Sequence, residues 1–204
     1  MTVPSVLPVA GTVVLLRPAP DGLEVLLMRR PDRGSFAGAW VFPGGKVEEG
    51  DRVPGADEVD DARRAAIRET AEEVGLVVDD LVVLSQWEPP EEITTRIRTW
   101  FFVASAPDQE PRPSAEEVAE LRWVSPAQAL AAHAAGEWTL FPPTWVTLDG
   151  LTRHADIEAV LAAAGEARAF RTRIVGTAFH WEAGVLETAE LPWTFAPVSS
   201  PAAG

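Results

Sequence analysis

The hydrophobic period of the chain changes at about residue 57, and this change separates strand-like from helical sequence. Apolar side chains then recur at helical spacing, at Val59, Ala62, Ala66, Ile67 and Ala71. Gly75 follows at the position where a helix commonly ends in the left-handed conformation. The pattern therefore predicts one long helix over residues 57–74, within a chain whose other segments are mostly typical of strands.

Short runs of apolar and β-branched residues flank this helix. The predicted strands cover residues 10–18, 23–31, 39–45, 79–87, 94–106 and 121–124. The turn APDG joins the first two into a hairpin, and the third runs into a glycine turn. The fourth and fifth are predicted to form a long strand pair.

The second half of the chain adds helices. Ser125 followed by a proline is the expected opening of a helix over residues 125–135, and a further helix covers 143–164 with a break near Gly150. Strands mixed with a few helices, without strict alternation, predict an α+β fold with a mixed sheet between helices. We expect one domain over residues 1–165, then an extension over 166–204 with a hairpin and a loose tail.

The charge and composition of the chain limit its partners. Thirty-one acidic against 17 basic residues give a net charge of −14, which repels nucleic-acid polymers and anionic membranes. The absence of cysteine excludes disulfides, thiolate catalysis and cysteine-based zinc sites. The N-terminal stretch has no basic segment and its apolar run is broken by prolines, so we expect neither a signal peptide nor a membrane span, and a cytoplasmic location. A second copy of the chain, in a homodimer, is a candidate partner.

The predicted helix carries three carboxylates on one face. Residues three and four apart share a helix face, so Glu69 lies beside both Glu72 and Glu73. The Glu69–Glu73 pair costs stability, because like charges repel at this spacing and the helix dipole disfavours anions near its C-terminal end. A hard divalent cation would compensate, since Mg²⁺ takes carboxylate oxygens and bridges them to phosphates. The alternative is a solvated face with ion pairs, the commoner use of a charge run.

A glycine turn, in the segment FPGGKVEEG (42–50), precedes the helix, and its backbone can approach a ligand closely. Together with the acid spacing, the stretch from Gly45 to Leu76 resembles the signature of the Nudix hydrolases. That signature is glycine, five residues, glutamate, seven residues, Arg-Glu, an aliphatic, any residue, Glu-Glu, any residue, glycine and an aliphatic. The segment RETAEEVGL (68–76) matches its second half, apart from Thr70 in an aliphatic position.

Nine extra residues interrupt the resemblance. The acid at the expected distance from Gly45 is Asp51, but the acid eight residues before Arg68 is Asp60, and RVPGADEVD (52–60) separates the two. A longer loop followed by the helix in normal register is the simplest explanation, because loop insertions cost little free energy. We therefore expect Asp60 or Asp61 to be the leading acid of the signature.

The resemblance implies both fold and chemistry. Its fold is an α/β/α sandwich in which a mixed, curved sheet lies between helices, with the signature forming a strand, a loop and a helix. Members of the family hydrolyse a nucleoside diphosphate linked to another group, using Mg²⁺ or Mn²⁺. Glu72 and Glu73 match the principal metal ligands, and Glu69 matches a further ligand or the group that orients the water.

The resemblance also implies supporting residues. The carbonyl of Gly44 is the expected backbone ligand of the metal, and Gly45 the expected contact of the substrate. Arg68 is expected to hold Glu72 or the leading acid in place. The general base, or a further metal ligand, comes from a distant loop in many relatives, and the candidates here are Glu116, Glu117 and Glu120, of which we select Glu117 as the base.

The substrate is less constrained than the reaction. Arg29, Arg30 and Arg33 precede the glycine turn and are candidates for gripping phosphates, because guanidinium groups match phosphate oxygens; of these we select Arg29 and Arg33. Arg29, Gly38 and FPGG partly match a motif of coenzyme A diphosphatases, so coenzyme A or an acyl derivative is one expected substrate. ADP-ribose, modified nucleotides, and a catalytically silent binding or regulatory domain of the same fold are the alternatives.

Overall fold

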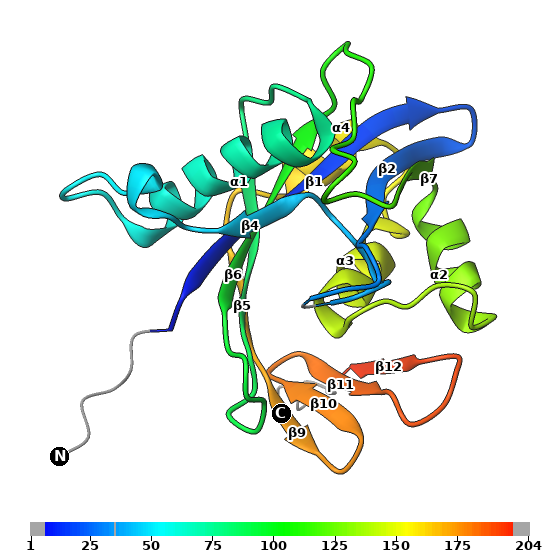
Figure 1. Cartoon of the computed structure of the whole chain (residues 1–204). Helices are drawn as coiled ribbons and strands as arrows, with labels where there is room; N and C mark the ends of the chain where they lie inside the picture. The colour runs from blue at the N-terminus through cyan, green and yellow to red at the C-terminus, as the bar shows by residue number, and fades with distance from the viewer. Residues whose placement is uncertain (1–6, 35, 198–204) are drawn as a thin grey trace, which may run out of the picture.

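The computed structural model describes residues 7–34 and 36–197, and a mixed sheet forms its centre (Figure 1). The strands are β1 (Val9–Ala19), β2 (Gly22–Arg29), β3 (Trp40–Val41), β4 (Gly44–Lys46), β5 (Val82–Glu88), β6 (Arg98–Ser105), β7 (Glu120–Val124) and β8 (Arg168–Arg171). Their order is β3-β2-β1-β6-β5-β8, with β4 also pairing β1 and β7 also pairing β2. The pairs β1–β6 and β5–β8 are parallel and the others antiparallel.

Four α-helices and a short 3-10 helix lie around the described part of this sheet. They are η1 (Glu49–Asp51), α1 (Glu58–Val74), α2 (Pro126–Ala134), α3 (Pro142–Leu151) and α4 (Ile157–Ala163). Helix α1 crosses one face, while the other three pack on the opposite face (Figure 1). The result is the sandwich of a curved mixed sheet between helices that the sequence predicted.

Helix α1 is seated directly on the backbone of the sheet. Gly11 of β1 has no side chain, and a Cβ there would lie 1.9 Å from the carbonyl oxygen of Ala62. Ala62 and Ala66 are fully buried against Val13 and Phe102, so small residues on the helix let it approach the strands closely. This close approach fixes where the acidic end of α1 lies relative to the glycine turn.

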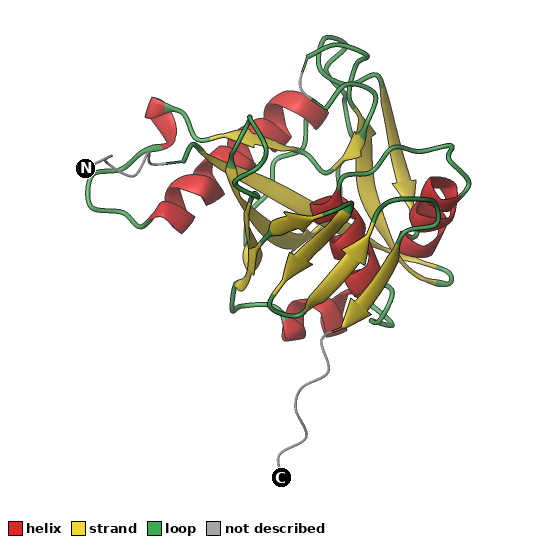
Figure 2. Ribbon diagram, turned by 90° about the horizontal axis from the view of Figure 1, so that it is seen from below, coloured by secondary structure: helices red, strands yellow, loops and turns green. Residues whose placement is uncertain are grey.

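The opposite face of the sheet is covered by α2, α3, α4 and a second, smaller sheet. The strands of that sheet are β9 (Arg173–Val175), β10 (Ala178–Trp181), β11 (Gly184–Glu187) and β12 (Thr194–Pro197), in the order β12-β11-β10-β9 (Figure 2). Trp87 of β5 stacks on Phe170 of β8 at 4.1 Å between ring centroids, and Trp181 of β10 lies within 6.0 Å of both rings. The C-terminal residues therefore share a core with the main sheet.

Most predicted elements are confirmed. The hairpin of β1 and β2 turns at Ala19 and Gly22, and Ser125 caps α2 by accepting the Gln128 N–H at 3.2 Å. The strand predicted over residues 39–45 is two short strands, because Pro43 has no N–H to continue a ladder. The helix predicted over 143–164 is two helices, and the first ends at Leu151, which agrees with the predicted break near Gly150.

A further correction concerns the C-terminal part of the chain. The hairpin predicted in the last forty residues exists as β10 and β11, but within a four-stranded sheet. The predicted tail over 197–204 lies outside the described residues apart from Pro197, and the division at residue 165 falls between α4 and β8, where it stays a prediction. Residues 7–34 and 36–197 contain no helix with the length and apolar character needed to cross a membrane.

Candidate active site at the acidic end of α1

The glycine turn lies against the acidic face of α1 because β4 pairs with β1 under the helix. Gly44 and Gly45 pair with Thr12 and Gly11, and Gly44 has a φ of 151°, a conformation that glycine alone adopts readily. A Cβ at Gly45 would lie 2.3 Å from the carboxylate of Glu69. The turn and the helix therefore meet at Glu69 without an intervening side chain.

Arg68 ties the carboxylates of this region together. Its Nη1 donates to Glu69 Oε1 at 3.0 Å and to Glu72 Oε2 at 2.9 Å, and its Nη2 donates to the Lys46 carbonyl at 3.0 Å. Its Nε and Nη2 also donate to the two carboxylate oxygens of Asp51, at 3.1 and 2.9 Å. The hydrogen bond to Asp51, helped by the charge of Glu69, holds the pKa of Arg68 above its usual range. A permanently charged guanidinium thus orients three acids at once.

Asp51 takes the place of the leading acid, so the expectation of Asp60 or Asp61 is wrong. Asp51 is 4% exposed, and burial by itself would raise its pKa. The hydrogen bonds from Arg68 and from the Glu48 N–H outweigh burial and hold the pKa of Asp51 below its usual value. Asp60 and Asp61 instead pair with Arg63 and Arg64. The insertion is accommodated after η1, which keeps Asp51 at its spacing from Gly45.

Glu73 is the most buried acid of the cluster, with 2% of its surface exposed. Its Oε2 accepts the Gly44 N–H at 2.8 Å, and its Oε1 accepts from Arg30 Nη1 at 3.2 Å. Burial raises the pKa of Glu73 to about 8; the bond from Gly44 and the charge of Arg30 lower it, whereas Glu69 and Glu117 raise it further. The contact of Gly44 with Glu73 is made by its amide, so the expected role of its carbonyl stays a prediction.

Glu69 and Glu117 belong to the same electrostatic cluster. Burial raises the pKa of Glu69, Arg68 lowers it, and the charges of Glu72 and Glu117 raise it. The loop that carries Glu117 is fastened to the end of α1, because the Ser114 N–H donates to the Glu73 carbonyl at 2.8 Å and the Glu117 N–H donates to the Ser114 carbonyl at 3.2 Å. This loop satisfies a carbonyl that a helix end leaves without a partner, and it brings Glu117 to the acids.

The other loop acids have different partners. Glu120 lies 3.9 Å from Arg29 Nε and also pairs with Arg122. The carbonyl of Glu116 accepts a hydrogen bond from Arg33 Nη2 at 2.9 Å. Arg29 also donates to Asp32 at 3.0 Å. Of the three candidate bases, Glu117 is therefore the one whose charge acts on both Glu69 and Glu73.

The sequence contained signals for Asp51 and Arg30, which our prediction did not place against the glutamates of α1. Asp51 has the spacing from Gly45 that the signature requires, and only the preference for an unbroken helical register set it aside. Leu26 and Met28 face α1, and Arg30 follows them at the same two-residue spacing, so the pleat of the strand directs its side chain to the same side. Thr70, the mismatched position, is fully buried and donates to the Ala66 carbonyl at 2.7 Å, which satisfies its hydroxyl within the helix.

The donor set suits a hard divalent cation. Within residues 7–34 and 36–197, no three His, Cys, Asp or Glu side chains are already arranged to hold a metal ion, and Arg30 and Arg68 contact the glutamates of α1. These glutamates supply carboxylate oxygens, which Mg²⁺ and Mn²⁺ prefer. The raised pKa of Glu73 also fits, because burial penalises its charge and a bound cation would favour it.

Comparison with known proteins agrees with this geometry. The family model described as NUDIX domain matches residues 7–143. An RNA pyrophosphohydrolase of Dinoroseobacter shibae is 32% identical over 110 residues, which cover 45% of this chain and 63% of that relative. A CTP pyrophosphohydrolase of Escherichia coli is 34% identical over 112 residues, covering 54% of this chain and 72% of the relative.

A solved structure shares the fold at lower identity. The NUDIX hydrolase from Alicyclobacillus acidocaldarius superposes with a TM-score of 0.70 at 22% identity, covering 81% of this chain and 99% of the other. The family match extends over more than half of the chain and includes the glycine turn, Arg68 and the three glutamates of α1. The chain belongs to the Nudix hydrolase superfamily.

Proposed function

We propose that this protein is a divalent-metal-dependent hydrolase of a nucleoside diphosphate linked to another group. One observation carries the proposal: Glu69, Glu73 and Glu117 lie in one electrostatic cluster at the glycine turn, with Arg68 holding Glu69 and Glu72. Carboxylates so close to one another repel, and a cation with phosphate oxygens around it relieves that repulsion. The names of both relatives, RNA pyrophosphohydrolase and CTP pyrophosphohydrolase, support cleavage at a pyrophosphate bond.

The chain supplies ligands, orientation and a proton acceptor. Glu72, Glu73, Glu69 and the Gly44 carbonyl would hold Mg²⁺ or Mn²⁺, and the ion would supply charge neutralisation for the phosphates and acidify a water. Glu69 orients the water and Glu117 accepts its proton as the water oxygen bonds to phosphorus. The phosphoanhydride bond breaks and its electron pair leaves on the departing phosphate oxygen. Arg68 acts through Glu69 and Glu72, whose carboxylates it holds in place.

The substrate proposal extends to coenzyme A or an acyl-coenzyme A. The motif residues that favour it form one structural unit: Arg29 donates to Asp32, and Gly38, with a φ of 69°, leaves room for that carboxylate, which a Cβ would approach to 2.9 Å. Arg29 and Arg33 are the proposed phosphate contacts. Asp32 and Glu120 already neutralise part of the positive charge of Arg29, whereas the contact of Arg33 is with the neutral Glu116 carbonyl. More of the charge of Arg33 is therefore available to a phosphate.

Replacing Glu73 by Gln tests the hydrolase proposal. The variant keeps a group that can accept from Gly44 but lacks the negative charge, so kcat should fall by about 100-fold or more while the fold is retained. Mn²⁺ binding, followed by electron paramagnetic resonance, should weaken in parallel. Glu137→Gln, at an exposed position after α2, is the matched control and should leave both quantities unchanged. Wild-type turnover by folded Glu73→Gln protein would remove the metal-site assignment.

A substrate screen decides the finer question. Coenzyme A, an acyl-coenzyme A, ADP-ribose, CTP and a 5′-triphosphate RNA oligonucleotide would be compared with Mg²⁺ and with Mn²⁺. The RNA tests the expectation that a net charge of −14 keeps polymers away. Cleavage of ADP-ribose without cleavage of coenzyme A would contradict the coenzyme A assignment alone. Tight nucleotide binding without any turnover would favour the silent binding domain, and sedimentation of the same samples tests the homodimer.

A further inference from the structure

Phe36 is an aromatic side chain held out to solvent. The large hydrophobic residues that are exposed in the described part of the chain are Phe36, Val53, Val77, Val175 and Leu191, and Phe36 is the one aromatic among them, 47% exposed. A ring of this size normally contributes to a core, because burying it is favourable. Its exposure is therefore a feature that the packing of the fold does not explain.

The backbone at Phe36 is also unusual. Its φ is 61°, in the left-handed region that bulky residues rarely adopt and that tends to occur at ligand sites. The conformation is held by a hydrogen bond from the Ala39 N–H to the Phe36 carbonyl at 3.1 Å. The ring is held by Phe141, which meets it edge to face at 4.8 Å between centroids and 86° between planes. The Phe36 ring is therefore held in one place by its contact with Phe141, although the backbone at this residue is strained.

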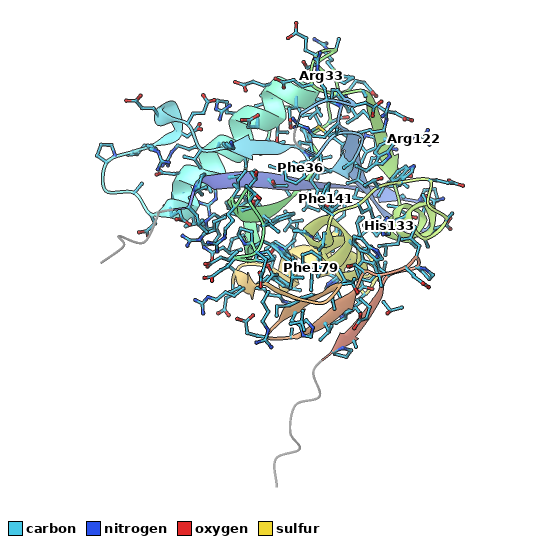
Figure 3. All side chains as sticks on the ribbon, turned by 60° about the horizontal axis from the view of Figure 1, so that its bottom comes forward. Arg33, Phe36, Arg122, His133, Phe141 and Phe179 are labelled. Carbon is cyan, nitrogen blue, oxygen red and sulfur yellow. The ribbon has the colours of Figure 1, made fainter. Side chains whose placement is uncertain are left out.

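The two rings join two separate connections of the fold (Figure 3). Phe36 lies between β2 and β3, whereas Phe141 is the N-cap residue of α3 and is half-buried. The connections are tied together because the Trp40 N–H donates to the Thr139 carbonyl at 2.9 Å. The aromatic pair is therefore built on fixed backbone rather than on one free loop.

The same connection leads directly into the acidic cluster. Arg30, at its start, contacts Glu73 at 3.2 Å, and Arg33 donates to the Glu116 carbonyl beside Glu117. The Arg30 N–H also donates to the Ala39 carbonyl at 2.9 Å. Phe36 is three residues from Ala39, so their Cα atoms are at most about 11 Å apart. Phe36 is therefore linked to Glu73 through Ala39 and Arg30, along the connection that joins β2 to β3.

We propose that Phe36 and Phe141 form a stacking platform for the base of the nucleotide half of the substrate. The inference rests on the proposed function, because it assumes a nucleoside diphosphate at the acidic cluster. Every base offers a π face, and aromatic side chains bind such faces with little dependence on base identity. Arg30 contacts Glu73 and Arg33 contacts the loop that carries Glu117, so both guanidinium groups lie near the acids, where the anionic part of the same ligand would bind. The platform would thus set affinity for the nucleotide rather than the rate of the chemical step.

Binding of ADP in the presence of Mg²⁺ tests the platform by calorimetry on the full chain. Stacking energies of this kind predict that Phe36→Ala and Phe36→Leu raise the Kd of ADP by about 5- to 150-fold. Phe36→Tyr should bind like the wild type. Phe36→Gly separates binding from stability, because glycine adopts the left-handed backbone without strain: it should lose ADP affinity while its Tm stays equal or rises. Val175→Ala, at another exposed apolar residue, should change neither quantity.

Each outcome has one reading. Wild-type ADP affinity in Phe36→Ala and Phe36→Leu overturns the platform, and so does a wild-type chain that binds no ADP. A change in sedimentation behaviour with unchanged ADP affinity would assign Phe36 to contact with a second copy and also overturn it. If diphosphates are hydrolysed but the Phe36 variants keep their KM, the platform alone fails. If ADP binds through Phe36 but no diphosphate is cleaved, the platform stands and the hydrolase proposal fails.

Discussion

Replacing Gly45 with alanine would displace the carboxylate of Glu69 without removing it, so it tests whether the position of Glu69 matters. A Cβ at residue 45 would lie 2.3 Å from both Cδ and Oε1 of Glu69, and 2.7 Å from Oε2. Because non-bonded carbon atoms rest at about 3.5 Å or more, the carboxylate must move by about 1 Å. A misplacement of about 1 Å in a catalytic arrangement can cost about 100-fold in rate. We therefore expect kcat to fall by about 100-fold, which corresponds to about 2.7 kcal/mol of activation free energy.

The same substitution should leave the fold nearly intact. The atoms that must give way are the far end of a side chain, and Gly45 does not have the positive φ of Gly44. We expect the free energy of unfolding to change by less than about 1 kcal/mol. Gly11→Ala is the contrasting variant, because its Cβ would lie 1.9 Å from the backbone oxygen of Ala62. Here α1 itself must shift, and the cost should reach about 3 kcal/mol.

Steady-state kinetics on the best substrate of the screen, with urea unfolding of the same samples, checks both expectations. The double variant Gly45→Ala/Glu69→Asp adds a sharper test, since the shorter acid leaves room for the new methyl group. Its rate should exceed the product of the two single effects, because the two positions are in contact. Wild-type kcat in a folded Gly45→Ala protein would refute the reasoning that Glu69 works only where the structure places it.

Three further perturbations test other parts of the structure. Asp51→Ala should lower the free energy of unfolding by about 2 kcal/mol, because it removes the buried partner of the partly exposed Arg68. Asp60→Ala should lower it by under about 1 kcal/mol, because the Asp60 side chain is 43% exposed. Equal losses of the two variants in urea unfolding would contradict the assignment of Asp51 as the leading acid. His133 is 4% exposed, and burial lowers its pKa from 6.5, so the unfolded chain binds a proton more readily than the folded chain. The free energy of unfolding should therefore fall as the pH drops below about 6.5, and thermal melts of His133→Gln should show a weaker dependence on pH. Ending the chain at Gly165 removes the rings stacked on β5, so cooperative unfolding should be lost, whereas a melt like that of the full chain would support a separate domain boundary there.

Local sequence patterns carried much of the fold. The helical spacing and Gly75 located α1, and the glycine adopts the left-handed φ of 69° that ends it. Ser125 and the following proline located α2. These predictions succeeded because caps, turns and amphipathic spacing are properties of neighbouring residues. The face shared by Glu69, Glu72 and Glu73 followed in the same way from the helical repeat.

Contacts between distant segments were decided only by the tertiary structure. Arg68 could have paired with several acids of the sequence, and the buried position of Asp51 selects it over Asp60 and Asp61. The position of the loop that carries Glu117 depends on the hydrogen bond from the Ser114 N–H to the Glu73 carbonyl at the end of α1. Phe36 and Phe141 are more than a hundred residues apart in the sequence, and no pattern in either local segment predicts their contact. Helical and strand periods act over a few residues, whereas such pairings depend on burial and on which loops the sheet brings together.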